Sequence, residues 1–277
     1  MNIVTLNVGQ GAMAIVRHNQ DAIIVDAHIP PSGDETVTYV KGMLASFLKN
    51  YSVRGLILTS FDADHADPYG VGLVLKKYRP DWVMYPKYYK DTEQTKKVFQ
   101  IIEQQEKERK NSETPLRRIS VRLDKIDSRK LTDLSDQFYF ELFSPHPEDM
   151  NSSNNSGIVL RMQDKGNGGF SYLITGDTEN DRWETINRLF GESLRSDVMA
   201  APHHGSKTGI NAETLLLVSP NTVLISAGVD NQYGHPDPQA VAVYNKTAKH
   251  VFSTNIEGGV SLYTYRGEND FETKLFR

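Results

Sequence analysis

The sequence has no cysteine, which excludes disulfide bonds, thiolate metal ligands and a cysteine nucleophile. It also has no apolar run close to the ~20 residues that a bilayer-spanning helix needs. Strand-like sequence begins at Ile3 to Leu6, without the basic and apolar regions of a secretory signal. These absences predict a free-standing soluble protein that does not bind a membrane, and we expect it in the cytoplasm.

Positive charge does not dominate the chain, which has 31 Lys and Arg against 35 Asp and Glu and a formal net charge of −4. This balance argues against a protein that coats nucleic acid with a uniformly basic surface. Between Lys87 and Lys130, however, 13 basic residues stand against 8 acidic ones. The segment fits either a basic flap that attracts phosphate or a solvated helix of mixed charge. The residues of such a flap would be Arg117, Arg118, Arg122, Lys125, Arg129 and Lys130.

A cluster of metal-binding side chains follows one apolar run. Residues 55–58 read Gly-Leu-Ile-Leu, typical of a buried strand, and residues 59–65 read Thr-Ser-Phe-Asp-Ala-Asp-His. Carboxylate and imidazole groups at Asp62, Asp64 and His65 suit zinc, manganese or a similar divalent ion. A surface loop with Asx-turns would give a similar pattern. The choice between them depends on the rest of the chain.

Three later segments repeat this arrangement and favour the metal site. An apolar run ends at Asp177, another ends at the pair His203-His204, and a third is followed by His235 in a Gly-His-Pro turn. If these strands lie side by side, their ends place carboxylates and imidazoles at one edge. His203 and His204 cannot both face a metal on extended backbone, because successive side chains then point to opposite sides. On that basis His203 is the preferred ligand.

Apolar periodicity predicts a mixed α and β chain. Strands are expected at 3–8, 12–16, 22–25, 55–58, 82–85, 118–123, 138–143, 158–162, 172–175, 198–200 and 222–226, and near Val251 and Val260. Helices are expected at 35–48, 71–78, 96–110, 181–190, 212–218 and 238–247. Meanders mixed with strand–helix units favour two sheets packed face to face with helices outside. The even spacing of strand signals predicts a single domain over residues 1–277, with a less certain charged insertion at about 88–136.

The order of these motifs resembles the metallo-β-lactamase fold of metal-dependent hydrolases, and most of all the soluble domain of ComEC-type bacterial DNA-uptake channels. The resemblance covers nearly the whole chain apart from about 88–136. It is carried by residues 6–11 (Leu-Asn-Val-Gly-Gln-Gly), 62–65, 154–160, 175–177, 203–206 (His-His-Gly-Ser) and 233–236 (Tyr-Gly-His-Pro). It implies an α+β fold, a four-layer αββα sandwich.

The resemblance also implies a centre of two divalent ions, zinc or manganese. Asp64, His65 and one of His203 and His204 would hold one ion, Asp62 would belong to the other, and Asp177 would bridge them, because a carboxylate offers an oxygen to each. The family usually has a histidine where this chain has Ser60. A neutral hydroxyl is a poor ligand, so one of the two positions is expected to be weak or to take a harder ion.

Together these features predict a metal-dependent phosphodiesterase, a nuclease with DNA as its substrate, in which an activated hydroxide attacks phosphorus. Asp64 and His235 are the expected catalytic residues, His235 as general acid or phosphate contact. Asp26 is either a partner of a metal ligand or simply a residue at the end of a strand. His28 is either a structural residue or a surface residue. The open alternatives are hydrolysis of a small phosphodiester or cyclic nucleotide, and a non-catalytic scaffold with a degenerate site. The residues expected to contact substrate are Ser60, Asn155, Ser206, Lys207 and Tyr233.

Overall fold

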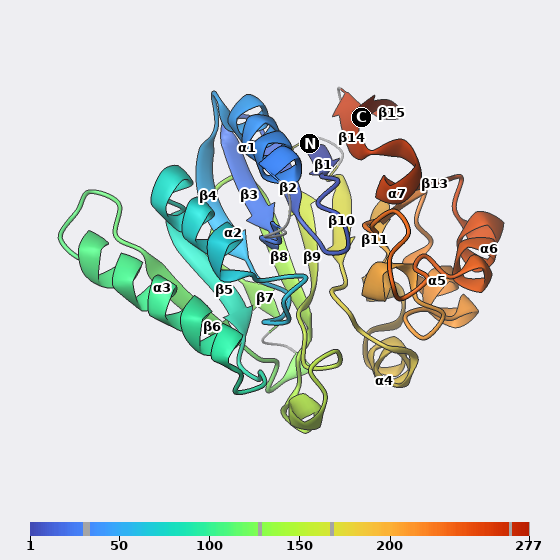
Figure 1. The fold of residues 1–277 in the computed structure, drawn as a ribbon. Helices are drawn as coiled ribbons and strands as arrows, with labels where there is room; N and C mark the ends of the chain where they lie inside the picture. Colours follow the sequence, from blue (N-terminus) through green and yellow to red (C-terminus); the bar gives the residue numbers. More distant parts are fainter. Residues whose placement is uncertain (30–33, 127–128, 167–168, 266–267, 277) are drawn as a thin grey trace.

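Two β-sheets packed face to face form the centre of the protein, with helices on their outer sides (Figure 1). The computed structural model describes residues 1–29, 34–126, 129–166, 169–265 and 268–276. Within these residues the predicted αββα sandwich is confirmed.

The first sheet has eight strands in the order β15-β14-β1-β2-β3-β4-β5-β6. Its strands are β1 (Asn2–Thr5), β2 (Ala14–His18), β3 (Asp21–Val25), β4 (Ser52–Ile57), β5 (Trp82–Pro86), β6 (Arg117–Val121), β14 (Gly259–Tyr265) and β15 (Glu268–Phe276). β1 pairs antiparallel with β2 and β14, whereas β3 to β6 run parallel. The opening meander therefore leads directly into a parallel unit whose strands all end at the same edge.

The second sheet has seven strands in the order β13-β12-β11-β10-β9-β8-β7. Its strands are β7 (Lys130–Leu131), β8 (Phe138–Ser144), β9 (Val159–Asp164), β10 (Ser171–Ile174), β11 (Val198–Ala200), β12 (Thr222–Ile225) and β13 (His250–Ser253). β10 to β13 are parallel, as β3 to β6 are in the first sheet. The chain thus repeats one plan, and each half contributes parallel strands whose carboxyl ends can carry functional side chains.

Helices cover both outer faces. The helices of the first half are α1 (Asp34–Leu48), α2 (Pro68–Leu73), which continues into a π-helical turn at Val74–Tyr78, and α3 (Glu93–Arg109). Those of the second half are α4 (Asn180–Phe190), α5 (Ala212–Val218), α6 (Pro238–Thr247) and α7 (Thr254–Glu257). Short 3₁₀ turns lie at Pro147–Asn151, Gly191–Leu194 and Pro202–Gly205. Among the described residues, no helix has both the length and the apolar character needed to cross a membrane.

Both faces of the central strands are apolar because each face meets a different layer. In β3, Ile23 belongs to the cluster shared between the two sheets, and the next residue, Ile24, belongs to the cluster beneath α1 and α3. Successive side chains point to opposite sides of a strand, so an unbroken apolar run fills two cores at once. Because the strands are packed on both faces, the loops that follow them begin from fixed positions.

The charged segment at 88–136 is built into both sheets. α3 lies against α2 and the π-helical turn, β6 extends the first sheet, and β7 forms the edge of the second. Several basic side chains of the expected flap have acidic partners: Arg118 pairs with Glu103 and Glu106, and Arg129 pairs with the buried Glu141. The surplus of positive charge is therefore partly neutralised where it stands.

Candidate metal centre

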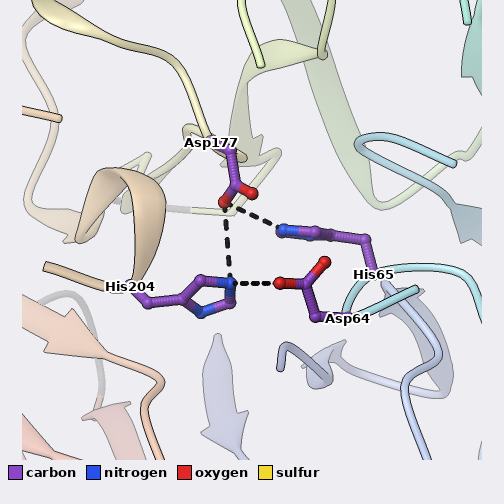
Figure 2. A group of neighbouring side chains, drawn as sticks. All are labelled: Asp64, His65, Asp177 and His204. Atoms are coloured by element: carbon purple, nitrogen blue, oxygen red, sulfur yellow. Dashed lines mark ion pairs between the residues drawn. The ribbon is translucent and has the colours of Figure 1, made fainter. Parts of the chain in front are cut away.

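Four side chains from both halves of the chain converge where the parallel strands end. Asp64 and His65 follow β4, Asp177 follows β10, and His204 follows β11. One ligand atom from each lies within 4.8 Å of the others, and the side chains point toward one another (Figure 2). His65 Nε2 is 2.9 Å from Asp177 Oδ1, and His204 Nε2 is 3.4 Å from Asp64 Oδ2 and 3.7 Å from Asp177 Oδ1.

The loop after β4 is fixed by its own backbone. The N–H groups of His65 and Ala66 both donate to the carbonyl of Asp62, which closes a tight turn. The carbonyls of Asp64 and His65 accept from the N–H groups of Ala12 and Ala27, at 2.8 and 2.7 Å, so the loop is held against the segments just before β2 and just after β3. The two ligands of this loop are therefore held before any ion binds.

Asp26 orients the ring of His65. It directly follows β3 in a left-handed conformation (φ 56°) and is buried. Its carboxylate accepts hydrogen bonds from Thr59, through both N–H (2.7 Å) and hydroxyl (2.8 Å), and from His65 Nδ1 (2.9 Å). A proton fixed on Nδ1 leaves the Nε2 lone pair facing the cluster, which is the arrangement of metal-binding histidines. Of the two roles left open for Asp26, the hydrogen bond to His65 favours the partner of a candidate ligand.

His204 is oriented in the same way, and it lies in the four-residue cluster, whereas the expected ligand His203 does not. Its Nδ1 donates to the carbonyl of Ser226 (2.8 Å), and its Nε2 faces Asp64 and Asp177. The preference assumed extended backbone, but His203 and His204 lie in a left-handed turn with φ of 50° and 55°. Strand alternation does not apply there. The His203 ring lies outside the four-residue cluster, with Nδ1 3.5 Å from Glu179 Oε1.

The donor set fits a divalent metal ion. His65 Nε2, His204 Nε2 and Asp177 Oδ1 are buried and make no hydrogen bond, although polar atoms at such depth are normally satisfied. Tetrahedral ligands about 2.0–2.1 Å from an ion lie about 3.3 Å from one another, close to the separations of 2.9, 3.4 and 3.7 Å found here. Two nitrogens and two carboxylates suit zinc or manganese. The four residues could hold such an ion with little rearrangement.

The pKa shifts in the cluster are those of a cation-binding site. Burial lowers the pKa of His65 and His204, but the nearby Asp177 carboxylate, with Asp26 and Asp64, outweighs it and raises both pKa values. Burial likewise opposes ionisation of Asp64 and Asp177, yet the adjoining imidazoles lower the pKa of both acids. Without a metal, protons on the imidazoles balance the carboxylates. A bound ion would replace these protons as the positive charge that balances the carboxylates.

A cavity of about 470 Å³ opens in front of the cluster. Its wall carries Asp62, Lys90, His203, Tyr233 and His235, together with Gln10, His28 and the loop at Ser153 and Asn154. Burial raises the pKa of Asp62, and the Lys90 charge opposes that rise. Burial lowers the pKa of His235, and the neighbouring imidazoles of His203 and His204 add to this effect. Lys90 and the imidazoles of the wall can therefore bind an anionic substrate beside the candidate metal ligands.

The other residues expected to contact substrate lie elsewhere. Ser60 is buried, and its Oγ accepts from the Asp62 N–H at 3.2 Å. Asn155 binds the loop after Asp177 through both ends of its amide. Ser206 shares hydrogen bonds with Thr208, and Lys207 is exposed. None of the four lines the cavity, whereas Tyr233 does.

Two cavity residues had no functional role in the sequence-based prediction. His28, expected to be structural or superficial, lies on the wall with Nδ1 2.8 Å from the carbonyl of Ala63. Lys90 follows β5 just as the metal ligands follow β4, β10 and β11. Its position shortly after the strand expected at 82–85 was a signal that sequence inspection could have used.

Comparison with known proteins gives two kinds of likeness. No protein-family model matches the chain. ComE operon protein 3 of Bacillus subtilis is 28% identical over 211 residues, 76% of this chain and 24% of that protein. Competence protein ComA of Neisseria gonorrhoeae is 31% identical over 131 residues, 46% of this chain and 18% of that protein. The chain thus spans a quarter or less of the length of these relatives.

Solved structures provide the second likeness. Igni18, described as a novel metallo hydrolase from the archaeon Ignicoccus hospitalis, superposes with a TM-score of 0.55 and 13% identity, covering 96% of this chain and 100% of that one. YhfI of Bacillus subtilis, described as a metallo-β-lactamase fold protein, gives a TM-score of 0.48 and 12% identity over 91% of this chain and 95% of that one. With its two packed sheets, the carboxylates and imidazoles that converge at their strand ends and the likeness to Igni18, the chain has the metallo-β-lactamase fold, and over the part that aligns its sequence resembles ComEC-type competence proteins.

Proposed function

We propose that the protein is a metal-dependent phosphodiester hydrolase and that its substrate is DNA. The observation that carries the proposal is the set of buried atoms His65 Nε2, His204 Nε2 and Asp177 Oδ1, which make no hydrogen bond and converge beside the polar cavity. Orphaned ligand atoms are costly to bury unless a cation satisfies them. Asp64, Asp177 and His204 of the cluster line a cavity of substrate size, which supports catalysis rather than a purely structural ion.

The four cluster residues would hold the ion, and the cavity wall would hold the substrate. A divalent ion in this position lowers the pKa of a water molecule and neutralises charge on a phosphoryl group. His235 lies across the cavity, with its ring 5.6 Å from that of His203. Its lowered pKa favours the neutral imidazole, whose N–H can donate to a phosphoryl or leaving-group oxygen. We therefore assign His235 to hydrogen bonding with the phosphodiester.

Two features support DNA as the substrate. The aligned part of the chain resembles competence proteins, among them one from Neisseria gonorrhoeae. In addition, Tyr233 is 58% exposed at the cavity, and its ring stacks on His235 at 5.9 Å with an interplanar angle of 19°. An aromatic ring supported on one face can accept a base on the other, and such stacking contributes about 1–3 kcal/mol per base.

The test compares two substrates in the presence of manganese or zinc. His204→Ala should abolish cleavage of both single-stranded DNA and a small chromogenic phosphodiester, because it removes a ligand. His235→Ala should slow cleavage but keep the metal content, and Glu213→Gln, at an exposed residue of α5 away from the cavity, serves as the control.

The outcomes separate the open alternatives. Cleavage of the small substrate with no action on DNA would move the assignment to a small phosphodiester or cyclic nucleotide. Bound metal without hydrolysis of either substrate would favour a binding or scaffold protein. Loss of metal from His235→Ala would show that His235 is a ligand rather than a substrate contact.

A further inference from the structure

The position expected for a second metal ion lacks a set of ligands. Ser60 presents a neutral hydroxyl that already accepts from the Asp62 backbone. Asn155 is fully engaged, since its Oδ1 accepts from the N–H of Glu179 (3.0 Å) and its Nδ2 donates to Asp181 (2.9 Å). Within the described ranges, the one group of His, Asp and Glu side chains close enough to hold an ion is the four-residue cluster, and Asp62 is outside it.

The ammonium group of Lys90 belongs to the wall of the same cavity as Asp62. Lys90 and Asp62 both line it, and the residue before each belongs to one aromatic cluster. The ring of Tyr89 lies 5.2 Å from that of Phe61 and 4.8 Å from that of Phe99 on α3. These contacts hold the backbone of Lys90 next to the metal loop.

A second connection holds the start of α3 against the same loop. Gln94 Nε2 donates to the carbonyls of Phe61 (3.4 Å) and Ala66 (3.2 Å), on either side of the metal-binding residues. The helix is capped by Thr92, whose hydroxyl accepts from the N–H of Thr95 at 3.1 Å. The connection from β5 to α3, which carries Lys90, is thus fixed at both ends, and its position beside Asp62 does not depend on an ion pair.

We propose that the chain binds one divalent ion and that the Lys90 ammonium supplies the second positive charge of the centre, binding a non-bridging oxygen of the substrate phosphate. Lysine is suited to this role as a compact charge with three donors. Asp62 lies on the same wall, where its carboxylate attracts the ammonium. The role of Lys90 rests on the proposed phosphodiester substrate, whereas the single ion rests on the ligand geometry alone.

Two measurements without substrate turnover test the proposal. Titration of chelator-treated protein with Mn²⁺, followed by calorimetry and elemental analysis, should give one ion per chain in the wild type and in Lys90→Met. Inorganic phosphate should then bind the manganese-loaded Lys90→Met about tenfold more weakly than the wild type, because a charge-assisted hydrogen bond is lost. Lys90→Arg should keep most of the affinity. Lys97→Met, an exposed lysine on α3 that does not line the cavity, should match the wild type.

Clear results would overturn each part. Two tightly bound ions in the wild type would refute the single-ion centre. Equal phosphate affinity of wild type and Lys90→Met, or an equal loss in Lys97→Met, would refute the role of Lys90. Neither result depends on hydrolysis, so failure to cleave DNA would remove the proposed activity and leave these two measurements standing on their own.

Discussion

Replacing Asp177 with asparagine should remove the stabilisation that metal gives to the fold. The change keeps the size of the side chain but removes the charge that lies 2.9 Å from His65 Nε2 and 3.7 Å from His204 Nε2. Asparagine is a weaker ligand than carboxylate for these ions. The variant is therefore expected to lose tight metal binding while it still fills its place in the strand-end turn.

The size of the effect can be worked out for the wild type. An ion that binds only folded protein stabilises it by about 2.7 kcal/mol when its free concentration is 100 times the Kd. For a chain of 277 residues, an unfolding entropy of about 2.1 cal/mol/K per residue amounts to about 0.58 kcal/mol/K. Tm should therefore rise by about 5 °C at that concentration in the wild type, and by little in Asp177→Asn.

Calorimetric melting of chelator-treated protein, with and without Mn²⁺ or Zn²⁺, measures this directly. Asp62→Asn is the matched control, because Asp62 lines the same cavity but lies outside the cluster, and it should keep the full rise in Tm. Equal rises in wild type and Asp177→Asn would refute the assignment of Asp177 as a ligand. No rise in either, at saturating metal, would refute the metal centre.

Two further predictions concern the partners and protonation of the ligands. Asp26→Asn should weaken metal binding by about 10- to 100-fold, because loss of a residue that hydrogen-bonds to a metal ligand has this effect at other sites. Competition with a chelator measures the affinity. An unchanged affinity would show that the hydrogen bond from His65 Nδ1 to Asp26 is not needed for metal binding. Because the pKa of His65 and His204 is raised in the folded, metal-free protein, their pairing should stabilise the fold below pH ~6.5, and this stabilisation should be lost as pH rises through the raised values. Metal affinity should increase over the same pH interval, since the imidazoles must lose protons to bind an ion. Urea unfolding of the metal-free protein and metal-binding calorimetry, each at pH 6 and pH 9, measure the two effects. Stability that rises, or metal affinity that falls, between these pH values would contradict the prediction.

Strand-end motifs could be located from the sequence because apolar runs and the charged residues after them are local patterns. β4, β10, β11 and β12 all lie within two or three residues of the predicted runs. By contrast, β7 has only two residues, and no periodicity can reveal so short a strand. Its pairing with β8 depends on the tertiary structure, as does the placement of β6 at the edge of the other sheet.

Side-chain roles were harder to predict than strand positions. The choice between His203 and His204 depended on a left-handed turn, and hydrophobic periodicity does not encode backbone conformation of that kind. The role of Asn155 was hidden because its hydrogen-bonding partners, Glu179 and Asp181, lie more than twenty residues away in the sequence. Counting charges over 88–136 likewise could not show that Arg118 and Arg129 have acidic partners.

The placement of the four ligands explains why one ion could control both stability and reactivity. Asp64 and His65 come from the first sheet, and Asp177 and His204 come from the second. An ion held by all four would connect the two sheets at the edge where their shared apolar core ends. Without it, the buried Asp177 and the half-buried Asp64 depend on protonated imidazoles, an arrangement that weakens as pH rises. Lys90 lies on a segment of the first half and His235 on a loop of the second, and both line the cavity. The cavity would therefore have the geometry needed for catalysis only while the two sheet edges are held together.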